Sequence, residues 1–141
     1  MSDKSKIGYR LFLVSRAHHN QASRKFGEIG LFRGQPQVLF KLGDHEGRTQ
    51  SELAEKLELT PATLTNLLTR MEHAGLIERR TDAADCRCTR IFLTEAGRIK
   101  LSQAVEQTQK MDEAAFAGFT PEEQERLNQY LERVHQNLTR D

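Results

Sequence analysis

The fold is decided by the stretch from Thr49 to Thr94, which reads TQSELAEKLELTPATLTNLLTRMEHAGLIERRTDAADCRCTRIFLT. Its first thirty or so residues place apolar side chains three and four positions apart, which is the spacing of amphipathic helices. After Gly75 the pattern becomes that of short strands separated by a polar turn. We therefore predict two short helices joined by a tight turn and followed by a β-hairpin.

Both helices carry clear start signals. Thr49 can accept a hydrogen bond from the backbone three residues on, and Glu52 can reach back to it, which makes a capping box. Thr60 is a second N-cap, and Pro61 suits the first helical position because the missing N–H would be unpaired there anyway. Gly75 is typical of the residue that ends a helix.

The second helix has one apolar and one polar side. Leu64, Leu67, Leu68 and Met71 are expected to face the core. The other side carries small polar residues, which let a helix approach base edges closely; Asn can pair with adenine, and a Thr methyl can meet a thymine methyl. The residues of this helix that we expect to contact DNA are Pro61, Ala62, Thr63, Thr65, Asn66, Thr69 and Arg70.

The hairpin is predicted from residues 76–80 and 90–93, with a polar tip at 81–88. The segment from Arg79 to Arg90, which covers the tip and the adjoining strand ends, holds four arginines and two aspartates. An aspartate can orient a guanidinium group, and an arginine on a hairpin tip fits a narrow minor groove. The hairpin would then be the wing of a winged helix-turn-helix. The expected wing contacts are Arg80, Asp85, Arg87 and Arg90.

This stretch resembles the MarR family of bacterial transcription regulators, closely over about one third of the chain and more loosely over the flanking helices. The family's wing usually has a basic residue between Asp85 and Arg87, where this chain has Cys86, so the wing carries less positive charge. The similar segments are Gly30-Leu31 with Gln35, Gln50-Ser51-Glu52-Leu53-Ala54, Gly75-Leu76-Ile77, Arg79-Arg80…Asp82…Asp85-x-Arg87 and Leu93-Thr94-Glu95-Ala96-Gly97.

The resemblance implies a homodimeric, sequence-specific DNA-binding regulator, most often a repressor that a small molecule releases. Two copies would place their recognition helices about 34 Å apart on a pseudo-palindromic operator. Thr49, Gln50 and Ser51 could bind phosphates through side chains and the helix N-terminus. The family's effector crevice lies between the dimer helices and the DNA-reading part. For an aromatic or anionic effector, the candidate contacts are Arg10, Arg16 and His18, with Arg70 as a further cation.

The flanking segments read as helices. We expect one over 7–26, one over 35–44 with Pro36 in its first turn, one from Thr94 to about Gly118, and a last one that starts at Thr120. The apolar stripe of the last helix cannot stay solvated, so it must dock on its own domain or on a partner. The resemblance places a dimer interface on the first helix and the last two helices. The interface residues that we expect are Ile7, Leu11, Val14, Leu127, Leu131, Val134 and Leu138.

The expected fold class is mainly α with a small β-hairpin wing (α+β). A single domain would cover 1–141, with dimerisation helices at 1–33 and 95–141 and the winged helix-turn-helix at 34–94. The length of 141 residues and the 37% hydrophobic content are ordinary for one globular domain. The absence of a signal peptide or an apolar run of ~20 residues predicts a cytoplasmic protein without a membrane partner.

Several alternatives stand beside this interpretation. The polar side of the second helix could simply be solvated, and a winged helix could serve protein contact alone. Arginines near Cys86 and Cys88 could lower a thiol pKa and make a redox-responsive regulator, although peroxide-sensing relatives carry their reactive cysteine near the N-terminus. No nucleophile–base pair, phosphate loop or metal-ligand spacing is visible, so we expect no enzyme, cofactor or metal.

Overall fold

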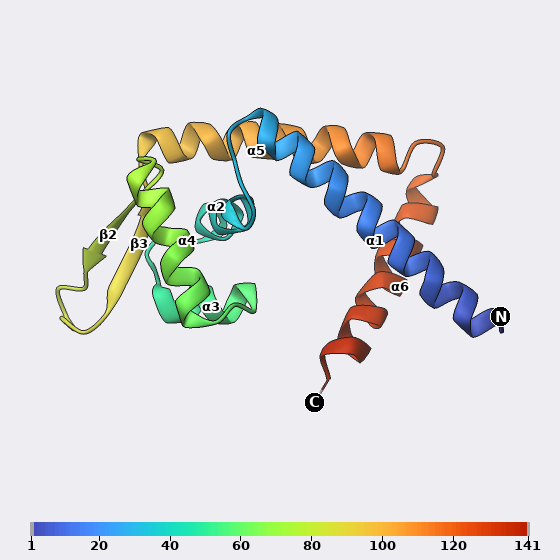
Figure 1. The fold of residues 1–141 in the computed structure, drawn as a ribbon, viewed down its shortest axis with the longest axis horizontal. Coiled ribbons are helices and arrows are strands. Elements are labelled where there is room, and N and C mark those ends of the chain that lie inside the picture. The colour runs from blue at the N-terminus through green and yellow to red at the C-terminus, as the bar shows by residue number, and fades with distance from the viewer. Residues whose placement is uncertain (1, 141) are drawn as a thin grey trace. The chain divides into compact units, whose positions relative to one another are not determined.

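The computed structural model describes residues 2–140, and within that range it contains six helices and three short strands. Its contacts divide the chain into two compact units, Met1–Thr108 and Gln109–Asp141, which are described one at a time. The predicted class, mainly α with a small antiparallel sheet, is confirmed. The elements (Figure 1) are α1 (Asp3–Glu28), α2 (Gln35–Asp44), β1 (Arg48–Thr49), α3 (Gln50–Leu57), α4 (Pro61–His73), β2 (Ile77–Thr81), β3 (Thr89–Leu93), α5 (Glu95–Ala115) and α6 (Pro121–Thr139).

The helix-turn-helix begins where the capping signals predicted it. The Thr49 hydroxyl accepts from the backbone N–H of Glu52 at 3.2 Å, and the Glu52 carboxylate accepts from the N–H of Thr49 at 3.2 Å. The Thr60 hydroxyl accepts from the N–H of Thr63 and starts α4. Glu58, in the left-handed conformation at φ 54°, ends α3 and turns the chain toward α4.

The hairpin is confirmed; its first strand is shifted by one residue and its second begins one residue earlier than predicted. The hairpin also pairs with a strand that we did not expect. The sheet order is β1-β3-β2, and both pairings are antiparallel. In the central strand, Ile91 lies opposite Arg48 on one side and opposite Arg79 on the other. β1 is only two residues long, too short to show any alternation in sequence, and it ties the start of α3 to the wing.

One hydrophobic core holds α2, α3, α4 and the sheet together. Burying each of its large side chains contributes about 1.5–3 kcal/mol. Leu67, which was expected in this core, is only half-buried, because it lies at its edge against Gly34, where an added Cβ would stand 3.0 Å from the Leu67 Cδ2. The large side chains that are fully buried are Leu31, Val38, Leu39, Leu42, Leu53, Leu64, Leu68, Met71, Ile77 and Ile91.

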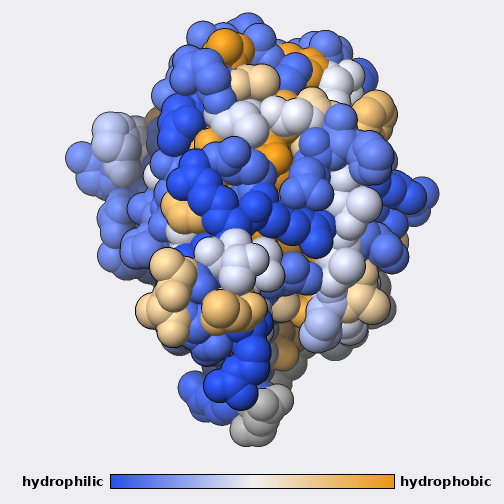
Figure 2. Space-filling model, turned by 90° about the vertical axis from the view of Figure 1, so that its left-hand side faces the viewer, coloured by the Kyte–Doolittle hydropathy of each residue, from blue (hydrophilic) through white to orange (hydrophobic). Residues whose placement is uncertain are grey.

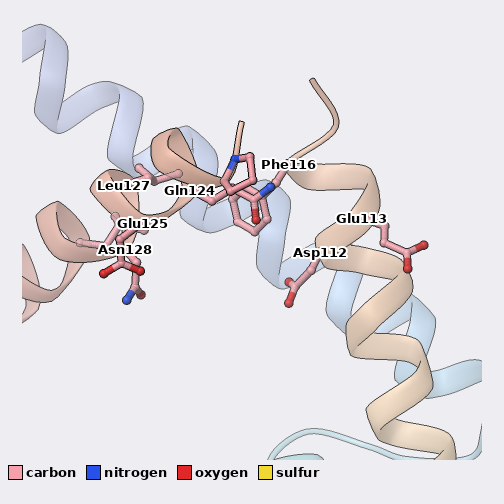
Figure 3. A pocket seen from close by; sticks show the side chains of 9 residues that line it. Asp112, Glu113, Phe116, Gln124, Glu125, Leu127 and Asn128 are labelled. Carbon is pink, nitrogen blue, oxygen red and sulfur yellow. The ribbon is translucent and has the colours of Figure 1, made fainter. Parts of the chain in front are cut away.

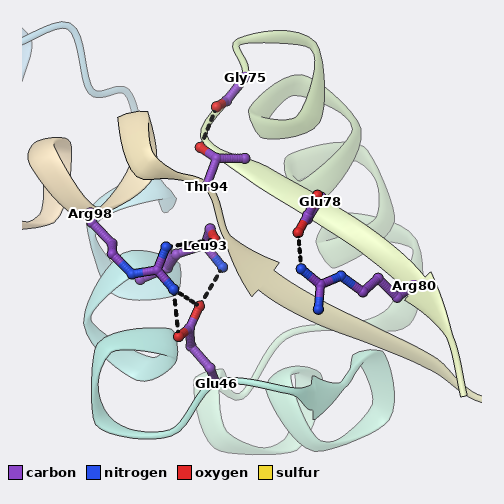
Figure 4. A network of polar contacts seen from close by, with 7 residues as sticks. All are labelled: Glu46, Gly75, Glu78, Arg80, Leu93, Thr94 and Arg98. Atoms are coloured by element: carbon purple, nitrogen blue, oxygen red, sulfur yellow. Dashed lines mark hydrogen bonds and ion pairs between the residues drawn. The ribbon is translucent and has the colours of Figure 1, made fainter.

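The first turn of α5 is fixed to the winged helix-turn-helix by polar contacts (Figure 4). Arg98 donates to both carboxylate oxygens of Glu46 at 3.0 and 2.9 Å, and Glu46 also accepts from the N–H of Leu93. Thr94 caps the helix by accepting from the N–H of Gly97. A Cβ on Gly97 would stand 2.0 Å from the Leu76 carbonyl oxygen, so only glycine fits this close approach.

The second unit consists of the last turns of α5 and helix α6. Thr120 and Glu123 form the expected capping box, and the Phe116 and Phe119 rings meet edge to face at 6.0 Å. A hollow of about 640 Å³ lies between the helices, and its lining combines Phe116 and Leu127 with acidic residues (Figure 3). None of the residues of α6 is buried.

Candidate nucleic-acid interface

The polar side of α4 is exposed over its whole length. It is displayed because the opposite side, with Leu64, Leu68 and Met71, is fully buried in the core. Seen from the side of the hairpin, the surface is largely hydrophilic (Figure 2). The seven residues that were expected to contact DNA are all exposed on this helix: Pro61, Ala62, Thr63, Thr65, Asn66, Thr69 and Arg70.

Hydrogen bonds from two neighbouring elements hold the middle of this surface. Gln50, at the start of α3, donates through Nε2 to the Thr65 hydroxyl at 2.7 Å. Arg79, on β2, donates through Nη2 to the Thr69 hydroxyl at 3.1 Å and to the Thr65 carbonyl at 3.4 Å. Helix α4 is therefore hydrogen-bonded to both α3 and the wing, and the three elements together form one surface.

Arg79 is the site residue that the sequence argument missed. Its side chain is 24% exposed, lies 4.0 Å from Glu72 through Nε, and that Nε makes no hydrogen bond within the described residues. The alternation of side chains along β2 could have identified it, because Arg79 shares a strand face with the buried Ile77, whereas Arg80 falls on the other face. Arg80 instead places its guanidinium 4.1 Å from the centre of the Phe92 ring and pairs with Glu78.

The base of the wing is stabilised by Arg90. Its Nε donates to Asp82 at 2.6 Å, and its Nη1 donates to the Gly47 carbonyl at 2.8 Å. The hydrogen bond from Arg90, with a second one from the N–H of Ala84, holds the pKa of Asp82 below its ordinary value. Arg90 was expected to contact DNA; its guanidinium also makes the two hydrogen bonds above, and its side chain is 40% exposed.

The tip of the wing presents Arg87. Asp85 accepts from the backbone N–H of Arg87 at 3.0 Å and, more weakly, from its Nε at 3.5 Å. The backbone hydrogen bond is the main reason that the pKa of Asp85 is lowered. The Arg87 side chain is 93% exposed, so its charge is displayed to solvent while the turn beneath it is ordered.

The cysteines correct one expectation. Cys86 is exposed and Cys88 is half-buried, and both are free thiols. The Cys88 thiol donates to Asp85 at 3.5 Å, and this hydrogen bond, together with the negative charge of Asp85, raises the pKa of Cys88. The prediction that nearby arginines lower a thiol pKa is wrong for Cys88, because the hydrogen bond to Asp85 and the charges of Asp85 and Asp82 outweigh the opposing charge of Arg90.

The remaining predicted residues are distributed over other elements. Thr49 and Gln50 are half-buried and engaged in the contacts above, while Ser51 is exposed at the start of α3. Arg10, Arg16 and His18 are exposed on α1. They line neither the hollow beside Phe116 nor a second hollow in the first unit, beside Glu46 and Arg98. Among residues 2–140, no group of three or more His, Cys, Asp or Glu side chains is arranged to hold a metal ion.

The expected interface residues differ in exposure. Leu127 is half-buried by its own unit, whereas the other six are exposed: Ile7, Leu11, Val14, Leu131, Val134 and Leu138. No helix within the described residues combines the length and the apolar character that a bilayer crossing requires.

Comparisons with known proteins agree with this geometry. Residues 32–89 match the family model described as the MarR family. The transcriptional regulator HosA of Escherichia coli is 35% identical over 104 residues, which cover 74% of this chain and 77% of HosA. The crystal structure of the transcriptional regulator SlyA superposes with a TM-score of 0.84 at 28% identity, over 97% of this chain and 94% of that one. A crystal structure of the S. aureus MepR–DNA complex gives a TM-score of 0.84 at 26% identity, over 98% of this chain and 100% of that one. The chain belongs to the MarR family of winged-helix transcription regulators.

Proposed function

We propose that this DNA-binding transcription regulator acts as a homodimeric repressor on a pseudo-palindromic operator. The observation that carries the proposal is the exposed polar side of α4, which is fastened to a wing that displays Arg87. A rigid helix with short polar side chains suits the major groove, and an arginine at a hairpin tip suits a narrow minor groove. The MepR–DNA complex, which has the same fold at 26% identity, supports this assignment.

The contacts with DNA divide into two classes. In the major groove, Asn66 and Arg70 on α4 contact base edges, while Arg87 enters the minor groove beside it. Ser51 and the N-terminus of α3 bind phosphate, which fixes the register of the protein on the duplex. Arg80 and Arg90 hold the shape of the wing, because each is already paired within the protein.

Dimerisation supplies the second half-site. Several apolar side chains on α1 and α6 are exposed, such as Val14 at 57% and Leu138 at 74%. They recur at helical spacing, which is typical of a surface that another helix covers. A second copy of the chain carries the same surfaces, and a two-fold dimer matches a palindromic site.

Control by a small molecule would act through this dimer. An effector that binds better to a dimer with widely spaced recognition helices would lower operator affinity by shifting the population of states. Arg10, Arg16 and His18 on α1 are the candidate contacts for an anionic or aromatic effector.

Selection of bound fragments from a pool of genomic DNA tests the proposal. We expect the purified protein to enrich fragments with a shared inverted repeat, and to bind the repeat with two chains per site. Affinity should fall steeply as salt rises, because phosphate contacts release counterions. Failure to enrich any sequence, with no DNA binding at low salt, would contradict the proposal and favour a winged helix used for protein contact.

A further inference from the structure

Two threonines on the exposed side of α4 have no hydroxyl proton left for a base. Thr65 donates through Oγ1 to the Pro61 carbonyl at 2.8 Å and accepts from Gln50. Thr69 donates through Oγ1 to the Thr65 carbonyl at 2.8 Å and accepts from Arg79. A hydroxyl carries a single proton, and in both side chains that proton is bound to the helix backbone.

This arrangement limits what the two threonines can recognise. Guanine shows two acceptors in the major groove and adenine shows one, its N7, so a side chain needs a free donor to bind guanine or adenine N7. Thr65 and Thr69 keep one lone pair each and the Cγ2 methyl group. The major-groove group that a methyl contacts is the C5 methyl of thymine.

Asn66 and Arg70 stand in contrast on the same helix. Both are exposed, and none of the interactions found among residues 2–140 engages their side chains. They therefore keep all of their donors, and the Asn66 amide keeps its acceptor too. The polar side of α4 thus combines two side chains that can donate to bases with two that cannot.

We infer that Thr65 and Thr69 recognise thymine through their methyl groups, while the hydrogen bonds donated to base edges come from Asn66 and Arg70. The inference rests on the proposed function. Gln50 and Arg79 act as positioning residues, because their donors fix the hydroxyl of each threonine. The operator half-site should therefore contain thymines whose C5 methyl groups themselves contribute to affinity.

The test is a uracil scan of the selected operator. Replacing one thymine at a time by deoxyuridine removes the C5 methyl and leaves the pairing with adenine unchanged. Loss of a methyl contact costs about 0.8 kcal/mol, so wild-type affinity should fall about fourfold at each contacted thymine. Thymines that the protein does not contact should tolerate the replacement.

Paired variants then assign the effect to each threonine separately. Thr65→Ser keeps the hydroxyl and removes the methyl. At the one thymine that Thr65 contacts, this variant should therefore bind the uracil and thymine operators equally well. Thr65→Val keeps a methyl and removes the hydroxyl, so it should stay sensitive to uracil there. Thr69→Ser and Thr69→Val should behave in the same way at another position. Such loss of sensitivity is the coupling that a contact produces in a double-mutant cycle.

A matched control is available on α6. Thr139 makes the same bond from its hydroxyl to the carbonyl four residues earlier, at 2.9 Å to His135. Thr139→Ser should therefore leave both operator affinity and uracil sensitivity as in the wild type. Each variant is checked for unchanged helical content and for unchanged affinity toward unrelated DNA.

Three results would overturn the inference. The wild type could bind every uracil operator as tightly as the original. The serine variants could keep the full uracil effect, or the valine variants could lose it as completely as the serine variants do. All three presuppose an operator that the wild type binds, so they differ from a failure of the proposed function, in which no operator is found.

Discussion

The winged helix-turn-helix and helix α6 differ in how much of their apolar surface a single chain can bury. On α4 the core side chains Leu64, Leu68 and Met71 are fully buried, and polar contacts tie the helix to its neighbours. In α6 Leu131 is 45% and Leu138 is 74% exposed, and no residue of the helix is buried. The winged helix-turn-helix buries its apolar side within one chain, whereas the terminal helix leaves its apolar stripe exposed.

The largest expected effect comes from a charge in the α6 stripe. Leu131→Glu should give a monomer, because an unpaired carboxylate cannot be buried in an apolar interface without a cost of several kcal/mol. A monomer reaches only one half-site, so operator affinity should fall roughly 10²- to 10⁴-fold, the usual range for loss of bivalent binding. Sedimentation and operator titration measure the two quantities.

Gln129→Glu is the control for this variant. It adds the same charge about half a helical turn away from Leu131, on the polar side of α6, and should leave the dimer intact. The winged helix-turn-helix should stay folded in both variants, as judged by amide exchange of α4. A dimeric Leu131→Glu protein would contradict the interface assignment.

A smaller effect is expected from the wing, with the dimer preserved. Arg87→Ala should weaken operator binding by about 5- to 150-fold, which corresponds to the 1–3 kcal/mol typical of a specific contact. Its side chain is 93% exposed, so unfolding temperature should not change. Operator titration beside a melting curve separates the two. Equal affinity of Arg87→Ala and wild type would remove the wing tip from the interface.

Arg90→Ala is a comparison variant for Arg87→Ala, because it changes the structure of the wing. This substitution removes the contacts to Asp82 and to the Gly47 carbonyl. It should therefore disturb the amide signals of the wing even without DNA, which Arg87→Ala should not do.

The smallest effect is an acid-induced loosening of the wing. Arg90 and the Ala84 N–H lower the pKa of Asp82 from its ordinary 3.8. Folded Asp82 thus binds a proton less readily than unfolded Asp82, so its stabilisation is complete above pH 3.8 and is lost as pH falls through the lower folded pKa. The Ala84 amide, which donates to Asp82 at 2.8 Å, should titrate by NMR with a midpoint below 3.8.

Asp82→Asn abolishes that titration if Asp82 is its source. A midpoint at or above 3.8 in the wild type would show that Arg90 does not stabilise the carboxylate. Signals of the α4 core should not move in the same range, since no ionisable side chain is part of it.

Local signals made the fold predictable. The caps at Thr49, Thr60 and Thr120 were all confirmed, because a cap depends only on residues within one turn. The spacing of leucines likewise identified the buried side of α4. β1 escaped prediction because two residues carry no periodicity, and its pairing with β3 joins positions about forty residues apart.

The polar contacts of the site were less predictable for the same reason. Arg90 reaches the carbonyl of Gly47, and nothing in the sequence near Arg90 indicates that partner. The residues Arg79 and Arg80 look alike in sequence, yet one supports α4 and the other stacks on Phe92. The sign of the Cys88 pKa shift depends on a hydrogen bond to Asp85, which only the folded turn creates.

The Glu46–Arg98 pair has a consequence for regulation. Glu46 precedes β1, Arg98 lies in the first turn of α5, and the same carboxylate also holds the N–H that ends β3. The direction in which α5 leaves the sheet therefore depends on this carboxylate together with the Thr94 cap and the close approach of Gly97 to Leu76. Any movement of α5 against the sheet must strain or break these contacts, so the junction determines how stiffly the winged helix-turn-helix follows α5.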